Sequence, residues 1–306
     1  MNSIAERFTE VMDKERIFVQ EPMKKHTTFR IGGPADYYLC PESPEEIAGI
    51  IHICKEEEIP YFILGNGSNL LVSDQGYRGA VIQIFKNMNK VEVTGERVIA
   101  YAGCLLSTAS KKAAEEGLTG MEFASGIPGT IGGAVVMNAG AYGGEMKDIV
   151  ESVTVLKCDG EVITLQKDQL EMGYRTSVIK TKGYIVLKAE LRLEHGDKEE
   201  IRKQMDILKE KRVTKQPLEY PSAGSTFKRP EGYFAGKLIQ DAGLRGYQVG
   251  GAKVSDKHCG FVINTGDATA RDVINLIRDV QDKVYDKFQV KMEPEVRFLG
   301  EFSEEE

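Results

Sequence analysis

Two glycine-rich runs are the segments of this chain best suited to bind a ligand through their backbone. Residues 124–134 contain four glycines and one proline among small and apolar residues, and residues 64–71 have the same character. Glycine lets a ligand approach the main chain closely, and the N–H groups of such turns form concave sites for anions, typically phosphate. Neither run has a GxxxxGK[ST] lysine or a GxGxxG spacing. The pair predicts a dinucleotide held outside the usual nucleotide-binding folds.

Three polar residues stand in contexts that suggest chemistry. Arg175 follows a Gly-Tyr pair, Ser225 follows a glycine, and Glu295 follows Pro294 at the start of an apolar strand. The proline forces an extended entry into that strand. Each residue also has an ordinary structural interpretation, as a paired surface arginine, a turn serine or an ion-paired carboxylate. The lack of a GxSxG motif disfavours Ser225 as an acyl nucleophile.

Composition narrows the class of protein. The 306 residues carry a net charge of −7 and suffice for about two domains. An acidic chain lacks the basic footprint of nucleic-acid binding, and no apolar run reaches the ~20 residues that span a bilayer. The first residues lack the features of a signal peptide, so we expect a cytoplasmic protein with no membrane or nucleic-acid partner. Five scattered cysteines and four histidines predict neither a disulfide framework nor a metal site.

Helical and strand patterns alternate irregularly along the chain, which predicts an α+β fold in at least two lobes. A strand at 59–64 leads into the first glycine run, and a helix at 107–116 precedes the second. A change in composition at Gln216 and Pro217 marks a domain boundary, and the acidic residues 304–306 predict a solvated tail. The other elements that we expect are helices at 43–54, 198–212, 234–241 and 269–288, hairpins at 91–100 and 153–165, and strands at 80–85, 184–193 and 295–299.

Taken together and in order, several of these segments resemble the UDP-N-acetylenolpyruvoylglucosamine reductase family, whose FAD-dependent members complete UDP-N-acetylmuramate for bacterial cell-wall synthesis. Each motif is modest, but their common order is specific. The resemblance extends from residue 26 to Gly300, almost the whole chain. The segments that carry it are 26–36, 64–71, 125–134, 138–143, 174–175, 224–227 and 293–297.

The resemblance implies a module for bound FAD of the vanillyl-alcohol-oxidase (PCMH) type over residues 1–215, made of two α+β subdomains divided near residue 75. Residues 216–306 would bind the UDP-sugar. The glycine turns would hold the FAD diphosphate through backbone N–H groups, and residues 138–143 would pass near the flavin. The cofactor-binding residues that it implies are Leu64, Gly65, Asn66, Gly67, Ser68, Asn69, Ser125, Gly126, Pro128, Gly129, Gly132, Gly133, Asn138, Gly140 and Tyr142.

The implied reaction passes hydride from NADPH, through FAD, to C3 of UDP-N-acetylglucosamine enolpyruvate, and then protonates C2. Arg175 and Glu295 match the positions that stabilise the enolate between these steps, and Ser225 matches the proton donor. A carboxylate helps an enolate only when it holds or shares a proton, so we expect Glu295 to be buried with a raised pKa. The substrate-binding residues that the resemblance implies are Tyr174, Lys228, Arg229 and Lys237.

Two departures from the family pattern leave open how the UDP diphosphate is held. Arg229 stands where many members have an asparagine that contacts substrate, and the chain lacks the tyrosine-bearing insertion of the longer family type. Lys253 and Arg245 are candidates for that role, while Lys228 or Lys237 is a candidate for assisting Ser225. We expect a monomer, with a weak dimer as the alternative.

Two other functions are compatible with the same motifs. One is an FAD-dependent oxidase of small alcohols or hydroxy acids built on the same module. The other is a nucleotide-sensing or flavin-storage protein without turnover. The oxidase would share both glycine runs, but it would not need the sequences around Ser225 and Glu295.

Overall fold

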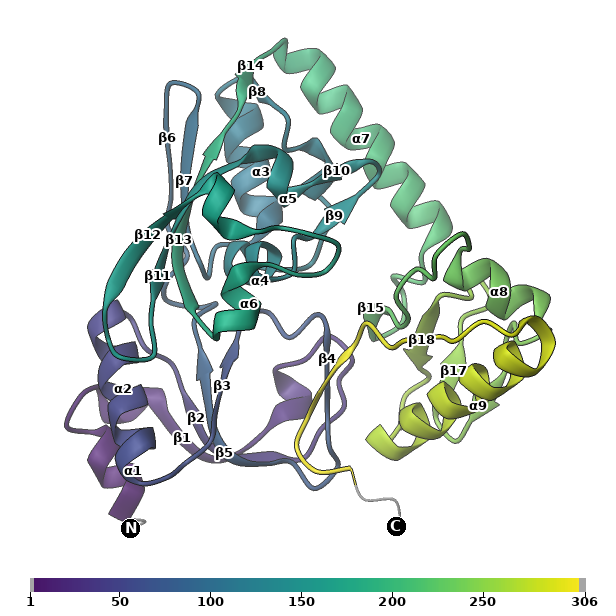
Figure 1. Cartoon of the computed structure of the whole chain (residues 1–306), viewed down its shortest axis with the longest axis horizontal. Helices are drawn as coiled ribbons and strands as arrows, with labels where there is room; N and C mark the ends of the chain where they lie inside the picture. Colours follow the sequence, from purple (N-terminus) through teal and green to yellow (C-terminus); the bar gives the residue numbers. More distant parts are fainter. Residues whose placement is uncertain (1–2, 303–306) are drawn as a thin grey trace. The chain divides into compact units, whose positions relative to one another are not determined.

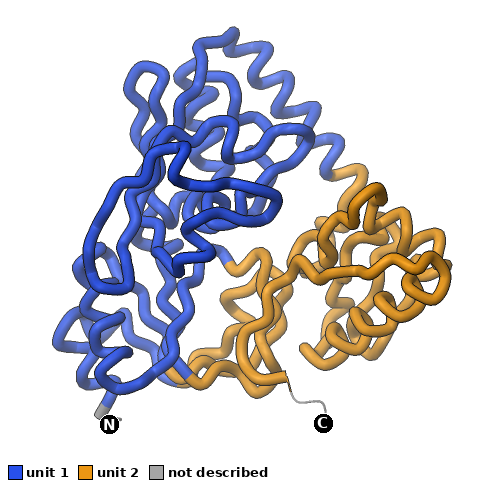
Figure 2. Tube along the Cα trace, in the orientation of Figure 1, with its two compact units in different colours: residues 1–19, 37–66, 79–212 blue, residues 20–36, 67–78, 213–306 orange. Residues whose placement is uncertain are grey.

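The structure is a computed structural model that describes residues 3–302 (Figure 1). The chain divides into two compact units (Figure 2): unit 1 comprises residues 1–19, 37–66 and 79–212, and unit 2 comprises residues 20–36, 67–78 and 213–306. The last break lies next to the boundary expected after residue 215, but two earlier segments also join unit 2. The division near residue 75 stays a prediction, and residues 304–306 lie outside the described residues.

A four-stranded sheet leads into the first glycine run. Its order is β1-β2-β5-β3, and β3 runs parallel to β5 with Leu64 opposite Gln83. Helix α2 begins after Ser43, whose side chain accepts a hydrogen bond from Glu46 N–H, and it buries an apolar stripe that includes Ile47. The elements of this part are α1 (Ser3–Phe8), η1 (Lys14–Arg16), β1 (Ile17–Pro22), β2 (Pro34–Leu39), α2 (Pro44–Glu56), β3 (Tyr61–Leu64) and β5 (Tyr77–Gln83).

A five-stranded antiparallel sheet forms the larger part of unit 1. Its order is β12-β11-β13-β7-β6. The two hairpins expected from the sequence are both present, as β6 with β7 and β11 with β12, and they share one hydrophobic core with α2 and α3. The elements are β6 (Val91–Thr94), β7 (Arg97–Tyr101), α3 (Leu106–Glu115), β11 (Val150–Leu156), β12 (Val162–Gln166), β13 (Ile185–Arg192) and α7 (Lys198–Lys215).

Short elements in unit 1 carry the second glycine run and the loops that follow it. The run extends from the last residue of η3 into the first turn of α4, and a small antiparallel pair, β9 with β10, comes next. These elements are β8 (Leu118–Thr119), η3 (Glu122–Ala124), α4 (Ile131–Val136), β9 (Gly140–Ala141), β10 (Gly144–Glu145), α5 (Met146–Ile149), η4 (Lys167–Leu170), α6 (Val178–Lys182) and β14 (Glu194–His195).

Unit 2 combines the C-terminal residues with two segments from early in the chain. Phe29 and Ile31 are buried in the same core as the helices α8 and α9, and Thr28 Oγ1 donates a 2.7 Å hydrogen bond to Ser222 O. Its four-stranded sheet has the order β15-β18-β17-β16, and β19 pairs in parallel with β4. The elements are η2 (Met23–Lys25), β4 (Leu70–Val72), β15 (Ser222–Ser225), α8 (Ala235–Asp241), β16 (Gln248–Val249), β17 (Ala252–Val254), β18 (Phe261–Asn264), α9 (Ala270–Phe288) and β19 (Arg297–Leu299).

The α+β class predicted from the sequence is confirmed, and the differences lie at element ends. Thr269 is the N-cap of α9 as expected, and Asp272 completes a capping box. The last strand begins at Arg297 rather than Glu295, because Glu295 N–H donates to Thr226 O instead of joining the pairing with β4. No helix within the described residues is long and apolar enough to cross a membrane.

Candidate cofactor and active site

The start of the first glycine run, residues 64–66, lies beside the second run in unit 1. A Cβ atom at Gly65 would lie 2.6 Å from Thr130 Oγ1, a contact that glycine avoids. Asn66 Nδ2 donates a 2.6 Å hydrogen bond to Pro128 O. The turn after β3 therefore contacts the turn before α4, and the two runs form one surface. We call residues 65–66 with residues 125–130 the cradle.

The cradle has backbone donors that the protein does not use. Ser125 N–H donates to Glu122 O, which closes the turn after η3. By contrast, the N–H groups of Asn66, Gly126 and Gly129 have no protein acceptor within residues 3–302. Unpaired N–H groups in such turns bind anions, so the cradle fits a diphosphate, as the sequence predicts.

Other residues of the two runs have structural contacts or belong to unit 2. Gly132 N–H donates to Ala102 O at 2.9 Å, and a Cβ atom at Gly132 would lie only 3.0 Å from Ala102 Cβ, so this glycine permits close packing. Gly133 faces open space apart from Thr130 Oγ1, and Leu64 is buried. The residues of the first run that belong to unit 2 are Gly67, Ser68, Asn69, Leu70 and Leu71.

Asn138 is a buried connector between two loops of unit 1. Its Nδ2 atom donates to Glu145 Oε2 at 2.7 Å and to Gly173 O at 3.1 Å, while its Oδ1 atom accepts from Lys147 N–H at 2.9 Å. The amide is therefore fully engaged with the protein. These contacts give Asn138 a positioning role, because they fasten the loop that carries Arg175. Cofactor contact by Asn138 stays a prediction.

Non-glycine residues with left-handed backbone occur in both of these loops. Arg175 has φ 56° and is half-buried, and its guanidinium carbon lies 5.2 Å from the ring centroid of exposed Tyr174. Tyr142 has φ 54° and is exposed between β9 and β10. Gly140 lies opposite Glu145 in the β9–β10 pair, and a Cβ atom at Gly140 would lie 2.7 Å from Gly144 O. Such backbone conformations are uncommon and concentrate at functional sites.

In unit 2, backbone pairing brings Ser225 and Glu295 to the same place. Ser225 ends β15, and the next residue, Thr226, accepts a 2.8 Å hydrogen bond from Glu295 N–H. Phe227 then forms a β-bridge with Pro294. We call residues 225–228 with residues 293–295 the junction. Ser225 is exposed, and Glu295 is half-buried, which corrects the full burial that we expected.

Both lysines predicted near the substrate form ion pairs. Lys228 Nζ lies 2.9 Å from Glu293 Oε2, and the hydrogen bond between them lowers the pKa of Glu293. Lys237 Nζ lies 2.6 Å from Asp241 Oδ2, one turn along α8. Substrate binding by either lysine stays a prediction, and it would compete with these pairs.

The three candidate groups for holding a diphosphate in unit 2 also have neighbours. The Arg229 guanidinium carbon lies 4.0 Å from the ring centroid of Phe234, an arrangement typical of cation–π contact. Lys253 Nζ lies 2.6 Å from Asp256 Oδ2, and Arg245 donates to Asp256 O. Of the three, Arg229 alone is stacked on an aromatic ring rather than bound to Asp256.

The sequence gives little indication that two further residues, His258 and Arg212, lie near these sites. His258 Nδ1 accepts from Gly260 N–H at 3.1 Å, and its ring meets that of Phe261 edge-on, 5.0 Å between centroids. Phe261 lies opposite Ser225, so His258 is close to the junction, and burial lowers the pKa of His258. In unit 1, Arg212 lies against the cradle, although the pattern of α7 reads as a charged surface helix.

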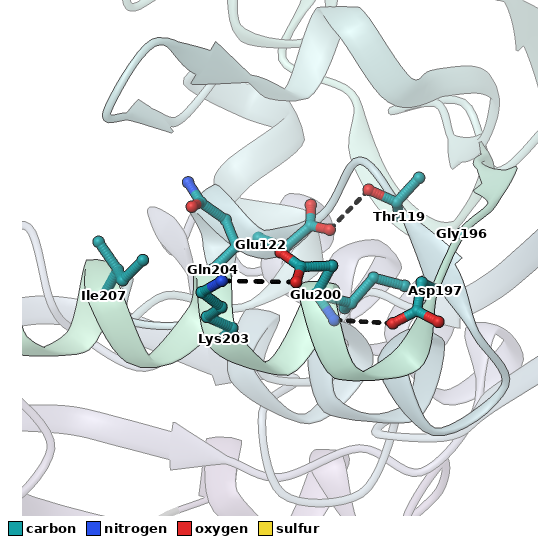
Figure 3. A pocket seen from close by; sticks show the side chains of 9 residues that line it. Thr119, Glu122, Gly196, Asp197, Glu200, Lys203, Gln204 and Ile207 are labelled. Atoms are coloured by element: carbon teal, nitrogen blue, oxygen red, sulfur yellow. Dashed lines mark hydrogen bonds and ion pairs between the residues drawn. The ribbon is translucent and has the colours of Figure 1, made fainter.

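A hollow of about 360 Å³ in unit 1 contains none of the predicted site residues (Figure 3). Its acidic side chains have local structural contacts, since Glu122 Oε1 accepts from Thr119 Oγ1 and Asp197 Oδ1 accepts from the N–H groups of Glu199 and Glu200. Across residues 3–302, no group of three or more His, Cys, Asp or Glu side chains is placed to hold a metal ion. The lining residues are Thr119, Glu122, Gly196, Asp197, Glu200, Ile201, Lys203, Gln204 and Ile207.

Comparison with known proteins decides the family. An FAD-binding domain model matches residues 35–166, and the model of the UDP-N-acetylenolpyruvoylglucosamine reductase C-terminal domain matches residues 216–299. The UDP-N-acetylenolpyruvoylglucosamine reductase of Agathobacter rectalis is 56% identical, covering 96% of this chain and 97% of that protein. The chain belongs to the UDP-N-acetylenolpyruvoylglucosamine reductase family. The reductase of Clostridioides difficile is 54% identical, covering 95% of this chain and 96% of that protein.

Solved structures agree with membership of the reductase family. The crystal structure of UDP-N-acetylenolpyruvylglucosamine reductase from Thermus caldophilus superposes with a TM-score of 0.80 at 37% identity, covering 93% of this chain and 99% of that chain. Phl p 4, a grass pollen allergen with glucose dehydrogenase activity, shares the fold over 64% of this chain and 44% of its own, with a TM-score of 0.50 at 14% identity. The chain is thus an FAD-dependent oxidoreductase whose FAD module is of the vanillyl-alcohol-oxidase type.

Proposed function

We propose that this chain reduces UDP-N-acetylglucosamine enolpyruvate to UDP-N-acetylmuramate, with NADPH as the reductant, in the synthesis of peptidoglycan precursors. The observation that carries the proposal is the junction, where backbone bonds hold Ser225 beside Glu295. Membership of the reductase family over almost the whole chain supports it, because the reaction needs both the FAD module and the C-terminal domain.

Each catalytic residue has a distinct proposed role. Bound FAD supplies the hydride transfer. The Arg175 guanidinium stabilises the negative charge of the enolate, and removal of such a donor costs roughly 10²–10³ in rate. The exposed Ser225 hydroxyl donates a proton to C2, and positioned proton transfer contributes about 10²–10⁴. Glu295 holds or shares a proton that stabilises the same enolate.

The proposed division of labour follows the family models. Residues 1–215 would form the FAD module and residues 216–306 would bind the UDP-sugar, in agreement with the segments that the two models match. We further propose that the enzyme is a monomer that acts in the cytoplasm. The substrate ligands in this proposal are Tyr174, Lys228, Arg229 and Lys237.

The test is an NADPH oxidation assay of the purified holoenzyme with and without UDP-N-acetylglucosamine enolpyruvate, with the product identified by mass spectrometry. We expect sustained NADPH oxidation only when the enolpyruvyl sugar is present, and UDP-N-acetylmuramate as the product. Equal NADPH consumption without the sugar, with rapid reoxidation by O₂, would instead indicate an oxidase. A holoenzyme that consumes no NADPH with the sugar present would contradict the proposal.

A further inference from the structure

Arg212 is a half-buried cation beside the cradle, and it has no ionic partner among the described residues 3–302. A Cβ atom at Gly126 would lie 2.9 Å from Arg212 Cδ and 3.4 Å from Arg212 Nη1, so the arginine lies across this glycine. Among residues 3–302, no carboxylate pairs with the guanidinium and no acceptor takes a hydrogen bond from it. The Tyr142 phenol is near enough to interact electrostatically with the guanidinium, but it is not a carboxylate and forms no hydrogen bond with Arg212 within residues 3–302.

The position of Arg212 on α7 explains why it points toward the protein. The helix buries Ile201 and Leu208, and Arg212 comes one turn after Leu208 on the same face. Arg212 is half-buried, so its guanidinium has lost part of its hydration, and this burial lowers the pKa of Arg212. Arginine is almost never buried unpaired, because a desolvated charge without a counter-ion is costly. The half-buried guanidinium and the neighbouring N–H groups of Gly126 and Gly129 therefore fit an anion.

We propose that Arg212 binds the diphosphate of FAD and supplies the positive charge of the cradle. The unused N–H groups of Gly126 and Gly129 lie in the same turn that Arg212 covers. A planar guanidinium offers two parallel hydrogen bonds to a phosphate group. The net charge of −7 gives the chain no general attraction for anions, so a local cation is needed. Arg212 lies outside the segments matched by both family models, 35–166 and 216–299.

The FAD diphosphate is not the only ligand with this chemistry. The diphosphate of the UDP-sugar and the phosphates of NADPH are anions of the same class. The structure favours FAD because Gly126 belongs to the segment that the FAD-binding model matches. The proposal rests on the FAD module and not on the sugar reaction. A flavin-binding measurement therefore tests it independently of the proposed function.

The test compares FAD dissociation constants of the full-length protein for the wild type, Arg212→Gln, Arg212→Lys and the control Arg202→Gln. Arg202 is exposed on the same helix, so its substitution makes the same charge change away from the cradle. Release of FAD is followed by its fluorescence over a series of KCl concentrations, and circular dichroism melts check that each variant folds.

We expect Arg212→Gln to weaken FAD binding about 10- to 100-fold, the range for a lost charge-assisted hydrogen bond. The salt dependence of the dissociation constant should become shallower, because a screened ionic contact is gone. Arg212→Lys should keep most of the salt dependence with a smaller loss of affinity, and Arg202→Gln should resemble the wild type. The proposal is overturned if Arg212→Gln binds FAD as Arg202→Gln does. It is also overturned if affinity falls with unchanged salt dependence, or if only the KM for NADPH or the sugar rises.

Discussion

The cradle and the junction place functional groups in two different ways. The cradle is made of unused N–H groups and of positions where a side chain would collide, such as Gly65 and Gly126. The junction is made of two polar side chains, Ser225 and Glu295, that backbone pairing holds beside each other. The cradle should therefore respond to any added Cβ atom, while the junction should respond to the chemistry of its side chains. We therefore expect that substitutions can impair FAD binding and sugar reduction separately.

The largest effect should come from Ser225→Ala at the junction. This variant should lose about 10²–10⁴ in the rate of sugar reduction, because the proposed proton donor is absent. Flavin reduction by NADPH should continue at the wild-type rate, and stopped-flow absorbance of the flavin separates the two half-reactions. Ser222→Ala on the same strand is the matched control. Equal loss of both half-reactions would remove Ser225 from the role of proton donor.

Asn138→Ala should give the next largest effect, through the loop that carries Arg175. Loss of the three hydrogen bonds of Asn138 should lower the free energy of unfolding by roughly 1–3 kcal/mol. A misplaced Arg175 should reduce kcat about 10- to 100-fold, measured with the enzyme saturated with FAD so that a lost cofactor contact does not contribute. Asn89→Ala is the control, since Asn89 Nδ2 bonds only to Lys86 O at the surface. Reduced stability with unchanged kcat would show that the contacts are merely structural.

Gly65→Ala tests the cradle with an effect on binding rather than on reaction. Its Cβ atom would lie 2.6 Å from Thr130 Oγ1, so the two turns must move apart and the FAD dissociation constant should rise by about 10-fold. Gly49→Ala is a matched control, because Gly49 lies in α2 and its Cβ atom would meet Cγ1 of Val11, a residue after α1 and outside the cradle, at 2.8 Å. If both variants bind FAD equally well, the cradle does not depend on Gly65.

The smallest effect should be the pH dependence contributed by His258 near the junction. Burial lowers its folded pKa, and Lys215 contributes in the same direction. The unfolded chain therefore takes up a proton near the ordinary pKa of about 6.5 before the folded protein does. Stability is thus fully present above that pH and falls as the pH drops further. His258→Gln should flatten the fall in melting temperature between about pH 7 and pH 5. A variant that titrates like the wild type would assign the pH dependence to other groups.

The sequence predicted what depends on local patterns. The two hairpins follow from the periodicity of the sequence, and the capped helix α9 follows from Thr269 with Asp272. Anion binding by the glycine turns stays a prediction. Long-range contacts were not predictable, because nothing near Phe29 in the sequence indicates that it enters the core of α8 and α9. The hydrogen bond of Asn138 to Gly173 O and the ion pair of Lys228 with Glu293 also join residues that are far apart in the sequence. Arg212 could not be predicted as a site residue, because a sequence shows that a side chain is charged but not whether it has an ionic partner.

The pairing of β4 with β19 imposes an order on how this protein is made. Leu70–Val72 leaves the ribosome long before its parallel partner Arg297–Leu299 is translated. Contacts this distant along the chain form slowly, and vectorial synthesis delays them further. Leu71 is fully buried in the finished fold, but the core residues that it shares with α8 and α9 are synthesised much later. Until β19 is synthesised, the nascent chain therefore exposes an apolar segment that is prone to aggregation. A chaperone is suited to bind this segment during that time.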